Sequence, residues 1–410
     1  MSGTLATGVN RRMSIGIQTA FGTIAPAAGA RRMPRVNSAP VFSRDSFASN
    51  TIELSQQVKS ARLGVKRGQV PYQGQLTPGT YPEFFRGLLR KDWVAGVSVT
   101  ATTISATYVA GTSLTFTRSA GSFITDGFKV GDVIRATGFT NAAAVMNNRN
   151  YRIVNMTATT LVTSGTGNET GVTVAAGDSV TLKVQGKKVM VPTNETGDPH
   201  LFSAFTWEDY FADLNKAEVY IGCRMQQLRL SFPPTGYVMF DAMMQAKDMA
   251  KYDTGAYFTS LTAPPAIQGL TGVNGIVRMN NGDVVTMTGL QLGISCQSES
   301  NPCIGSDTVP EIFQGVISVS GSGSLYLGDM VNRDNYLGET EGEMHLFMTS
   351  DGTLNSPFMT AIMPRVKMMG VQKSDSPLSI MQSVTFQALE GTGANNRDRS
   401  TIIFQDSELT

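Results

Sequence analysis

The two histidines, His200 and His345, are the side chains of this sequence best suited to proton transfer near neutral pH. Each of them begins a His-Leu-Phe tripeptide. The repeated context favours a structural or interfacial role shared by the two copies, with a catalytic base as the alternative.

Two adjacent carboxylates, Glu208 and Asp209, could in principle serve as the acid and base of glycoside cleavage. Neighbouring side chains of a strand point to opposite faces, so these carboxylates are not expected to share a site. The glycine-rich stretch 315–328 lacks the Gly-Lys-Ser/Thr of a phosphate-binding loop and alternates like a strand. We therefore predict no catalytic site, and the protein is not expected to be an enzyme.

The three cysteines, Cys223, Cys296 and Cys303, are an odd number without a Cys-x-x-Cys pair. Together with two histidines they do not supply the closely spaced set of four ligands that structural zinc prefers. Assembly in a cytosol would keep the thiols reduced, although a bridge between Cys296 and Cys303 is an alternative. We predict neither a metal nor a cofactor.

The composition favours a β-rich protein with much surface buried against copies of itself. Of 410 residues, 41% are hydrophobic and only 16% are charged, against about 25% in an ordinary soluble domain. The net charge of +1 argues against a surface that grips nucleic acid as a whole. No stretch approaches the ~18 apolar residues of a membrane span, and the N-terminus lacks the apolar core of a signal peptide, so we expect synthesis in a cytosol.

A β-hairpin is predicted between residues 222 and 248. Alternate apolar side chains form one face of its first strand, at Leu228, Leu230 and Phe232. A Pro-Pro-Thr-Gly turn ends this strand, because prolines lack the amide hydrogen that a ladder needs. The apolar run that follows is predicted as the returning strand.

This hairpin resembles the signature segment of bacteriophage tail tube proteins. The resemblance lies in a glycine followed by a cation (Gly222 to Arg224), an amphipathic strand, a Pro/Gly turn and a long returning strand that ends at Lys247 and Asp248. It implies a structural virion protein that polymerises as stacked rings into the tail tube, the conduit for DNA ejection into the host. Tube-wall or inter-subunit positions are implied for Gly222, Arg224, Leu228, Leu230, Phe232, Arg365 and Met368.

The resemblance also implies the partners and the place of assembly. The expected partners are further copies of the chain, the tape measure protein, double-stranded DNA passing through the lumen, and the tail terminator and distal tail proteins. The expected location is the virion tail, assembled in the cytoplasm of a bacterial host.

Arginines gather near the N-terminus, where no acidic residue precedes Asp45. We predict a flexible arm that folds only against a neighbour, with a transit peptide or a nucleic-acid-binding arm as alternatives. The resemblance favours an arm that reaches an adjacent ring. Its candidate contact residues are Arg11, Arg12, Arg31, Arg32 and Arg35.

Between Val97 and Gly186 the chain becomes rich in Thr, Val, Ala and Gly, with short alternating runs between turn residues. This pattern predicts an inserted small all-β domain, a barrel or an immunoglobulin-like sandwich. Just before it, aromatic and leucine residues recur at helical spacing from Tyr81 to Leu89, which predicts a short helix that faces the core.

The order of motifs suggests a duplication interrupted by the insertion. Gly68, His200 and Arg224 of the first half are echoed by Gly315, His345 and Arg365, and the returning strand 237–246 is echoed by 380–388. The predicted fold is mainly β, with two tandem tail-tube-type sandwich or barrel units, short helices and one inserted domain. The predicted boundaries are 1–45 for the arm, 46–95 and 187–262 for the first unit, 96–186 for the inserted domain, 263–390 for the second unit and 391–410 for a C-terminal extension.

Two units per chain would close a pseudo-six-fold ring with three subunits, whereas an illusory repeat would leave a hexamer. Two other functions stay open at this point. One is a tube protein of a secretion system, and the other is an extracellular glycan-binding β-protein.

Overall fold

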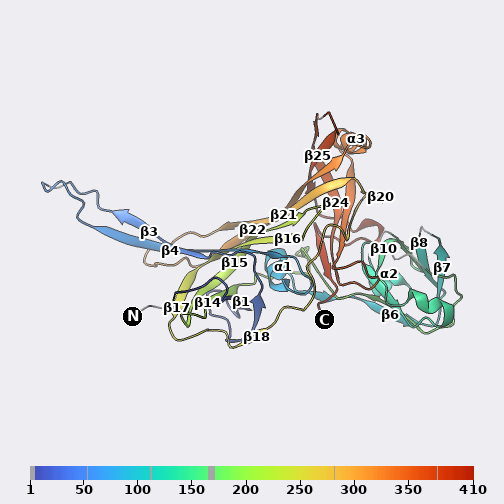
Figure 1. Cartoon of the computed structure of the whole chain (residues 1–410), viewed down its shortest axis with the longest axis horizontal. Helices are drawn as coiled ribbons and strands as arrows, with labels where there is room; N and C mark the ends of the chain where they lie inside the picture. Colours follow the sequence, from blue (N-terminus) through green and yellow to red (C-terminus); the bar gives the residue numbers. More distant parts are fainter. Residues whose placement is uncertain (1–4, 53, 111–112, 165–170, 281, 376) are drawn as a thin grey trace.

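A computed structural model describes residues 5–52, 54–110, 113–164, 171–280, 282–375 and 377–410. Strands dominate the described chain and helices are short, which confirms the predicted mainly-β class (Figure 1). One large, strongly curved sheet runs through both halves of the sequence, and a second sheet belongs to a segment inserted within the first half.

Outside the inserted segment, the first half of the sequence contributes the helix α1 and one region of the large sheet. Its elements are β1 (Arg11–Ile17), β2 (Ala28–Met33), β3 (Val41–Ala48), β4 (Ala61–Gln75), α1 (Pro82–Leu89), β14 (Phe205–Phe211), β15 (Lys216–Phe232), β16 (Met239–Ala246), β17 (Asp248–Tyr252) and β18 (Ser260–Thr262). The second half contributes β19 (Gly275–Met279), β20 (Gly282–Asp283), β21 (Met287–Glu299), β22 (Phe313–Tyr326), α3 (Val331–Leu337), β23 (Glu341–Thr349), β24 (Phe358–Ser374) and β25 (Met381–Ala388).

The two halves repeat the same strand pairings. In the first half β1 pairs with β14, β14 with β15, β15 with β16, β16 with β4, and β4 with β3. In the second half the same five antiparallel pairings join β19, β23, β24, β25, β22 and β21 in that order. The helices α1 and α3 follow the corresponding strands β4 and β22. We call these two sets of elements the first and second repeat.

β-bulges fix the residue register between the repeats, because the three bulges of the first repeat recur at corresponding places in the second. The bulge of β15 lies between Met225 and Gln227, and that of β24 lies between Met368 and Gly370. With these aligned, Ala246 corresponds to Ala388, as the sequence echo predicted. Three other echoes are wrong in register. Gly68 corresponds to Val319, Arg224 to Lys367, and the counterpart of His345 is Glu208 rather than His200.

The core of the first repeat forms where α1 packs on the sheet. Proline starts this helix, Arg90 ends it in the left-handed conformation, and its apolar face is buried, as the spacing predicted. The ring of Tyr81 stacks on Phe240 with centroids 4.4 Å apart. In the second repeat α3 buries none of its residues, so the two helices differ in packing although they share a place in the topology.

The segment inserted within the first repeat, between α1 and β14, forms a seven-stranded sheet with its own apolar core. Its strands are β6 (Ser98–Ala101), β7 (Ile104–Val109), β8 (Ser113–Arg118), β9 (Val133–Thr137), β10 (Tyr151–Met156), β11 (Thr160–Thr163) and β12 (Val180–Val184), with the short helices α2 (Phe123–Asp126) and η1 (Asn141–Met146). On either side of this sheet, β5 (Val94–Ala95) and β13 (Lys187–Met190) pair with each other. The chain therefore leaves and re-enters the body at one place.

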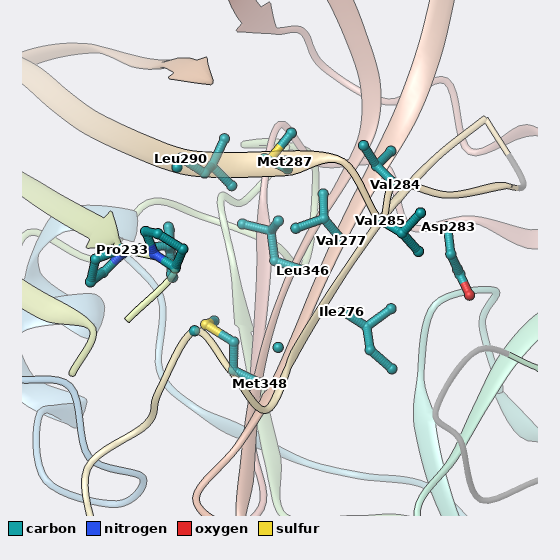
Figure 2. Close-up of a pocket in the computed structure, with 15 residues that line it drawn as sticks. Pro233, Ile276, Val277, Asp283, Val284, Val285, Met287, Leu290, Leu346 and Met348 are labelled. Carbon is teal, nitrogen blue, oxygen red and sulfur yellow. The ribbon is translucent and has the colours of Figure 1, made fainter. Parts of the chain in front are cut away.

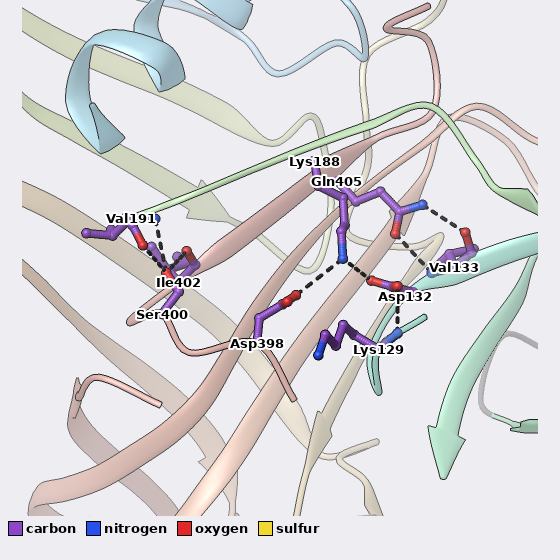
Figure 3. A network of polar contacts seen from close by, with 9 residues as sticks. All are labelled: Lys129, Asp132, Val133, Lys188, Val191, Asp398, Ser400, Ile402 and Gln405. Atoms are coloured by element: carbon purple, nitrogen blue, oxygen red, sulfur yellow. Dashed lines mark hydrogen bonds and ion pairs between the residues drawn. The ribbon is translucent and has the colours of Figure 1, made fainter. Parts of the chain in front are cut away.

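The C-terminal segment ties this inserted sheet to the body. It contains η2 (Ala394–Asn396) and β26 (Ile403–Asp406), and β26 pairs with both β13 and β24. A polar network lies beside β26, where Lys188 Nζ is 2.7 Å from Asp132 Oδ1 and 3.2 Å from Asp398 Oδ2 (Figure 3). Gln405 accepts the Val133 N–H at 2.9 Å and donates to the Val133 carbonyl at 2.8 Å.

The predicted flexible arm is instead part of the folded body. Within residues 1–45, β1 pairs along its whole length with β14 and also with β2, and β3 pairs with β4. Met13 and Ile15 are buried in the core. The lack of acids before Asp45 predicts an arm, but the acidic partners of its arginines lie farther along the chain, on α1 and β14.

Candidate assembly surfaces

The junction between the two repeats is a strand pairing. Residues 227–232 of β15 pair antiparallel with residues 290–295 of β21, so that Leu228 lies opposite Ile294 and Arg229 lies opposite Gly293. This pairing joins β15 of the first repeat to β21 of the second. It turns two sheet regions into one continuous sheet.

The counterparts of these two edges have no strand partner in the described chain. Beyond Lys367, β24 pairs only with β25, so residues 370–374 present one open edge. β3 pairs only with β4, and its outer edge is open as well. We call these the β24 edge (370–374) and the β3 edge (41–44). The β24 edge is thus the counterpart of the β15 edge that pairs at the internal junction. The β3 edge is the counterpart of the β21 edge at the same junction.

One face of the large sheet carries mainly hydroxyl and amide groups, with few charges. Because side chains alternate along a strand, the residues opposite the core point to this polar face. On the strands of the second repeat its exposed members are Gln291, Ser295, Ser318, Ser320, Ser324, Ser383 and Thr385. The first repeat adds Gln227, Arg229 and Gln75 to the same kind of surface.

The hairpin formed by β3 and β4 extends from the body into solvent, at the left of Figure 1. It carries apolar side chains that no part of the described subunit covers. These exposed residues are Val41, Phe47, Ile52, Leu54, Val58 and Leu63. Exposed apolar groups on a strand edge are typical of contact surfaces, since free they would promote aggregation.

The sequence-predicted tube-wall residues are mostly buried inside the subunit. Gly222, Arg224, Leu228, Leu230 and Met368 are all buried, whereas Phe232 is half-buried and Arg365 lies in an ion pair with Glu341 at the surface. Most of these side chains therefore pack within the subunit, and their part in a tube wall or in contacts between subunits stays a prediction.

Gly222 and Arg224 have specific local roles. Gly222 has a φ of +67°, and a Cβ there would lie 2.8 Å from Lys247 Cβ, so the position requires glycine. Arg224 Nη2 lies 2.9 Å from Glu311 Oε1, and Nη1 donates to the Ile312 carbonyl at 3.0 Å. Burial lowers the pKa of Arg224, which Glu311 opposes. This arginine holds the tip of the second repeat's hairpin to the first repeat.

The five N-terminal arginines mostly make contacts within the chain. Arg11 forms an ion pair with Asp209, Arg12 lies 3.3 Å from Glu208, and Arg31 lies 3.0 Å from Glu83. Arg35 donates to the Arg11 carbonyl at 2.6 Å, and Arg32 is exposed. A contact of these arginines with an adjacent ring stays a prediction. Among the five, Arg32 is the exposed one, and the other four are partly buried.

The two adjacent carboxylates serve separate structural contacts. Asp209 binds Arg11, while Glu208 Oε1 accepts the N–H groups of Tyr257 at 2.5 Å and Phe258 at 3.1 Å. They point to different partners, as expected for neighbours on a strand.

The two histidines lie in different environments. His345 is buried in β23, where burial and the charges of Arg152, Arg397 and Arg278 lower its pKa to about 3. It is neutral at pH 7 as a result. His200 lies in the loop before β14, and burial together with the charge of Arg90 lowers its pKa too.

All three cysteines are free thiols, with Cys223 and Cys296 buried and Cys303 exposed, so the alternative bridge is not formed. Within the described ranges, no group of three or more His, Cys, Asp or Glu side chains is placed to hold a metal ion. A search of the same residues finds no helix with the length and apolarity needed to cross a membrane.

An apolar cavity of about 420 Å³ lies at the junction of the repeats (Figure 2). Side chains from β19, β21 and β23 line it together with Phe232, Pro233 and Pro234 of the predicted turn. Asp283 is its one carboxylate. A lining of this kind lacks the convergent polar groups that orient a small polar substrate.

Comparison with known proteins gives one family. The model of the phage tail tube protein family matches residues 8–388. A search of curated proteins finds no match. The matched range includes both repeats and the inserted sheet. With most of its length matched, this chain belongs to the phage tail tube protein family.

Proposed function

We propose that three copies of the chain close a ring by pairing the β24 edge of one subunit with the β3 edge of the next. Membership of the family makes the protein a structural component of the virion tail. The rings would stack into the tail tube and conduct DNA into the host. The observation that carries this proposal is the internal junction β15–β21, whose counterparts are the two open edges.

The register of the new junction follows from the repeat. Arg229 and Gly293 lie opposite each other inside the chain, and their counterparts are Gln372 and Val41. In the same way, the Leu228–Ile294 pair corresponds to Val371 and Phe42. We therefore expect Gln372 of one subunit opposite Val41 of the next, with Val371 opposite Phe42.

Closing the ring removes every exposed edge of the large sheet at these positions. A free edge offers unpaired N–H and C=O groups to any other chain, and a closed barrel has none. With two repeats per subunit, a ring of three subunits has six similar junctions. Three of them lie within a subunit, and three lie between subunits.

The polar face suits a channel for DNA. Hydroxyl and amide groups such as those of Ser320 and Thr385 give no row of cations to trap phosphates through counterion release. If this face lines the lumen, DNA passes without strong binding. The tape measure protein would occupy the same channel before ejection, and the tail terminator and distal tail proteins would bind the tube ends, with assembly in the bacterial cytoplasm.

The test uses matched charges at the predicted junction. Val41 and Gln372 are both exposed, so substitution leaves the core intact. Val41→Glu with Gln372→Glu places like charges opposite each other, whereas Val41→Glu with Gln372→Lys places opposite charges there. Ring formation is followed by negative-stain microscopy across a range of protein concentrations.

We expect rings of three from the wild type and from the opposite-charge variant. The like-charge variant should need at least about tenfold more protein, because the unfavourable pair recurs at each of the junctions between subunits. Equal assembly of the two variants, or rings of six chains, would contradict the proposal.

A further inference from the structure

The tip of the second repeat's hairpin, residues 300–312 between β21 and β22, packs back onto the first repeat. Asp307 Oδ2 lies 3.1 Å from Lys66 Nζ, and its carbonyl accepts the Lys66 N–H at 2.9 Å. Val309 of this tip is only 3% exposed. The internal junction is therefore built from two parts, a strand pairing and a hairpin tip that covers the neighbouring repeat.

The first repeat has the corresponding tip, the 49–60 segment between β3 and β4, described at residues 49–52 and 54–60. Both hairpins carry the same bulge, between Arg44 and Ser46 in one and between Cys296 and Ser298 in the other. Counting along the chain from this bulge places Val58 at the position of Val309. Val58 is 71% exposed, whereas Val309 is buried. The first tip is thus exposed at a position that is covered in its counterpart.

The second repeat has a hollow where that tip would rest. On the first repeat, Lys66 binds both Asp307 of the tip and Asp248, from which it lies 3.4 Å away. The counterparts of Lys66 and Asp248 are Ile317 and Glu390. Both of these residues line a cavity of about 290 Å³, beside the exposed Val316. A hollow of mixed polar and apolar lining, with Val316 and Ile317 among its apolar members, thus lies at the place that the internal junction covers in the other repeat.

We infer that the 49–60 tip of one subunit docks over Val316 and Ile317 of the adjacent subunit in the same ring, with Val58 buried at the contact. The occupant is a second copy of this chain, because the internal junction already shows the equivalent tip on the equivalent surface. The inference rests on the proposed ring and adds a second contact at each junction between subunits. Exposed Ile52 and Leu54 extend the apolar area of the tip.

The test is a cross-link between Val58→Cys and Val316→Cys, in a Cys303→Ser background that removes the exposed native thiol. The matched control joins Val273→Cys with Val316→Cys, because Val273 is equally exposed but lies outside the tip. Assembled rings are oxidised mildly and resolved without reductant. We expect covalent links between subunits for the first pair and none for the control.

A second variant measures the energy of the contact. Val58→Asp should raise the protein concentration needed for ring formation by on the order of tenfold, since a charge replaces a side chain that becomes buried. Val273→Asp should leave it unchanged. Rings that form normally with Val58→Asp and give no link between residues 58 and 316 would overturn the tip contact while leaving the ring itself intact. If no rings form from the wild-type chain, the proposed function fails first.

Discussion

Lys188 Nζ and Asp132 Oδ1 lie 2.7 Å apart where the inserted sheet meets the tube body. Burial alone would lower the pKa of Lys188, but the charges of Asp132 and Asp398 raise it, so the ammonium group stays charged. Burial raises the pKa of Asp132, and Lys188 counteracts this. The lysine therefore holds together two carboxylates from segments that are distant in sequence.

Replacing Lys188 with methionine should lower the free energy of unfolding by about 3–5 kcal/mol, because it leaves the buried Asp132 and the half-buried Asp398 without their cation. The control is Lys183→Met, on an exposed position of β12. Urea unfolding of unassembled subunits at pH 7 measures the difference. Similar losses from the two variants would show that the ion pair contributes little to docking of the inserted sheet.

Asp406 makes the stability of the subunit depend on pH. Burial raises its pKa to about 7, although its carboxylate accepts the Gly79 N–H at 2.7 Å and the Glu408 N–H at 3.0 Å. Between about pH 4 and 7 the folded state holds a proton that the unfolded state has lost, so the free energy of unfolding falls as pH rises through this range.

We therefore expect the variant Asp406→Asn to lose less stability than the wild type between pH 4 and pH 7, by on the order of 4 kcal/mol. Urea unfolding at several pH values gives both curves. Parallel curves would mean that Asp406 has an ordinary pKa in the folded protein.

The polar face leads to a prediction about how strongly the tube binds DNA. Adding cations with Ser320→Lys and Thr385→Lys should make tubes retain double-stranded DNA at low salt and release it at high salt, because phosphate binding by lysines depends on counterion release. Thr107→Lys, on an exposed position of the inserted sheet, is the control. Sedimentation of tubes with labelled short duplexes measures retention. Equal retention by control and face variants would place this face outside the channel.

Local pattern predicted much of the fold. Alternation and turn residues identified the 222–248 hairpin, and helical spacing identified α1, because both depend on neighbours along the chain. The duplication was visible as an order of motifs. Its register was not, because single identities such as His200 and His345 do not fix which strand positions correspond. The repeated bulges do, and they exist only in paired strands.

Long-range pairing explains the part of the site that the sequence did not reveal. Arg11 and Arg12 looked like a free basic arm because Glu208 and Asp209 lie almost two hundred residues away. The open edges could not be predicted either, since an edge is defined by the strand that is missing beside it. A useful signal was present in the apolar residues Ile52, Leu54 and Val58, which stand in a polar segment without strand alternation and are exposed in the subunit.

The most direct measurement of the ring is a cross-link at the predicted junction between subunits. Val41→Cys with Gln372→Cys, and separately Phe42→Cys with Val371→Cys, are introduced in the Cys303→Ser background. Adjacent pairs are used because only one of two neighbouring positions in an antiparallel ladder brings the β-carbons close enough for a disulfide. The account predicts that oxidised rings give a ladder of one, two and three linked subunits that stops at three. A ladder that continues to six, or rings without any link at either pair, would contradict it.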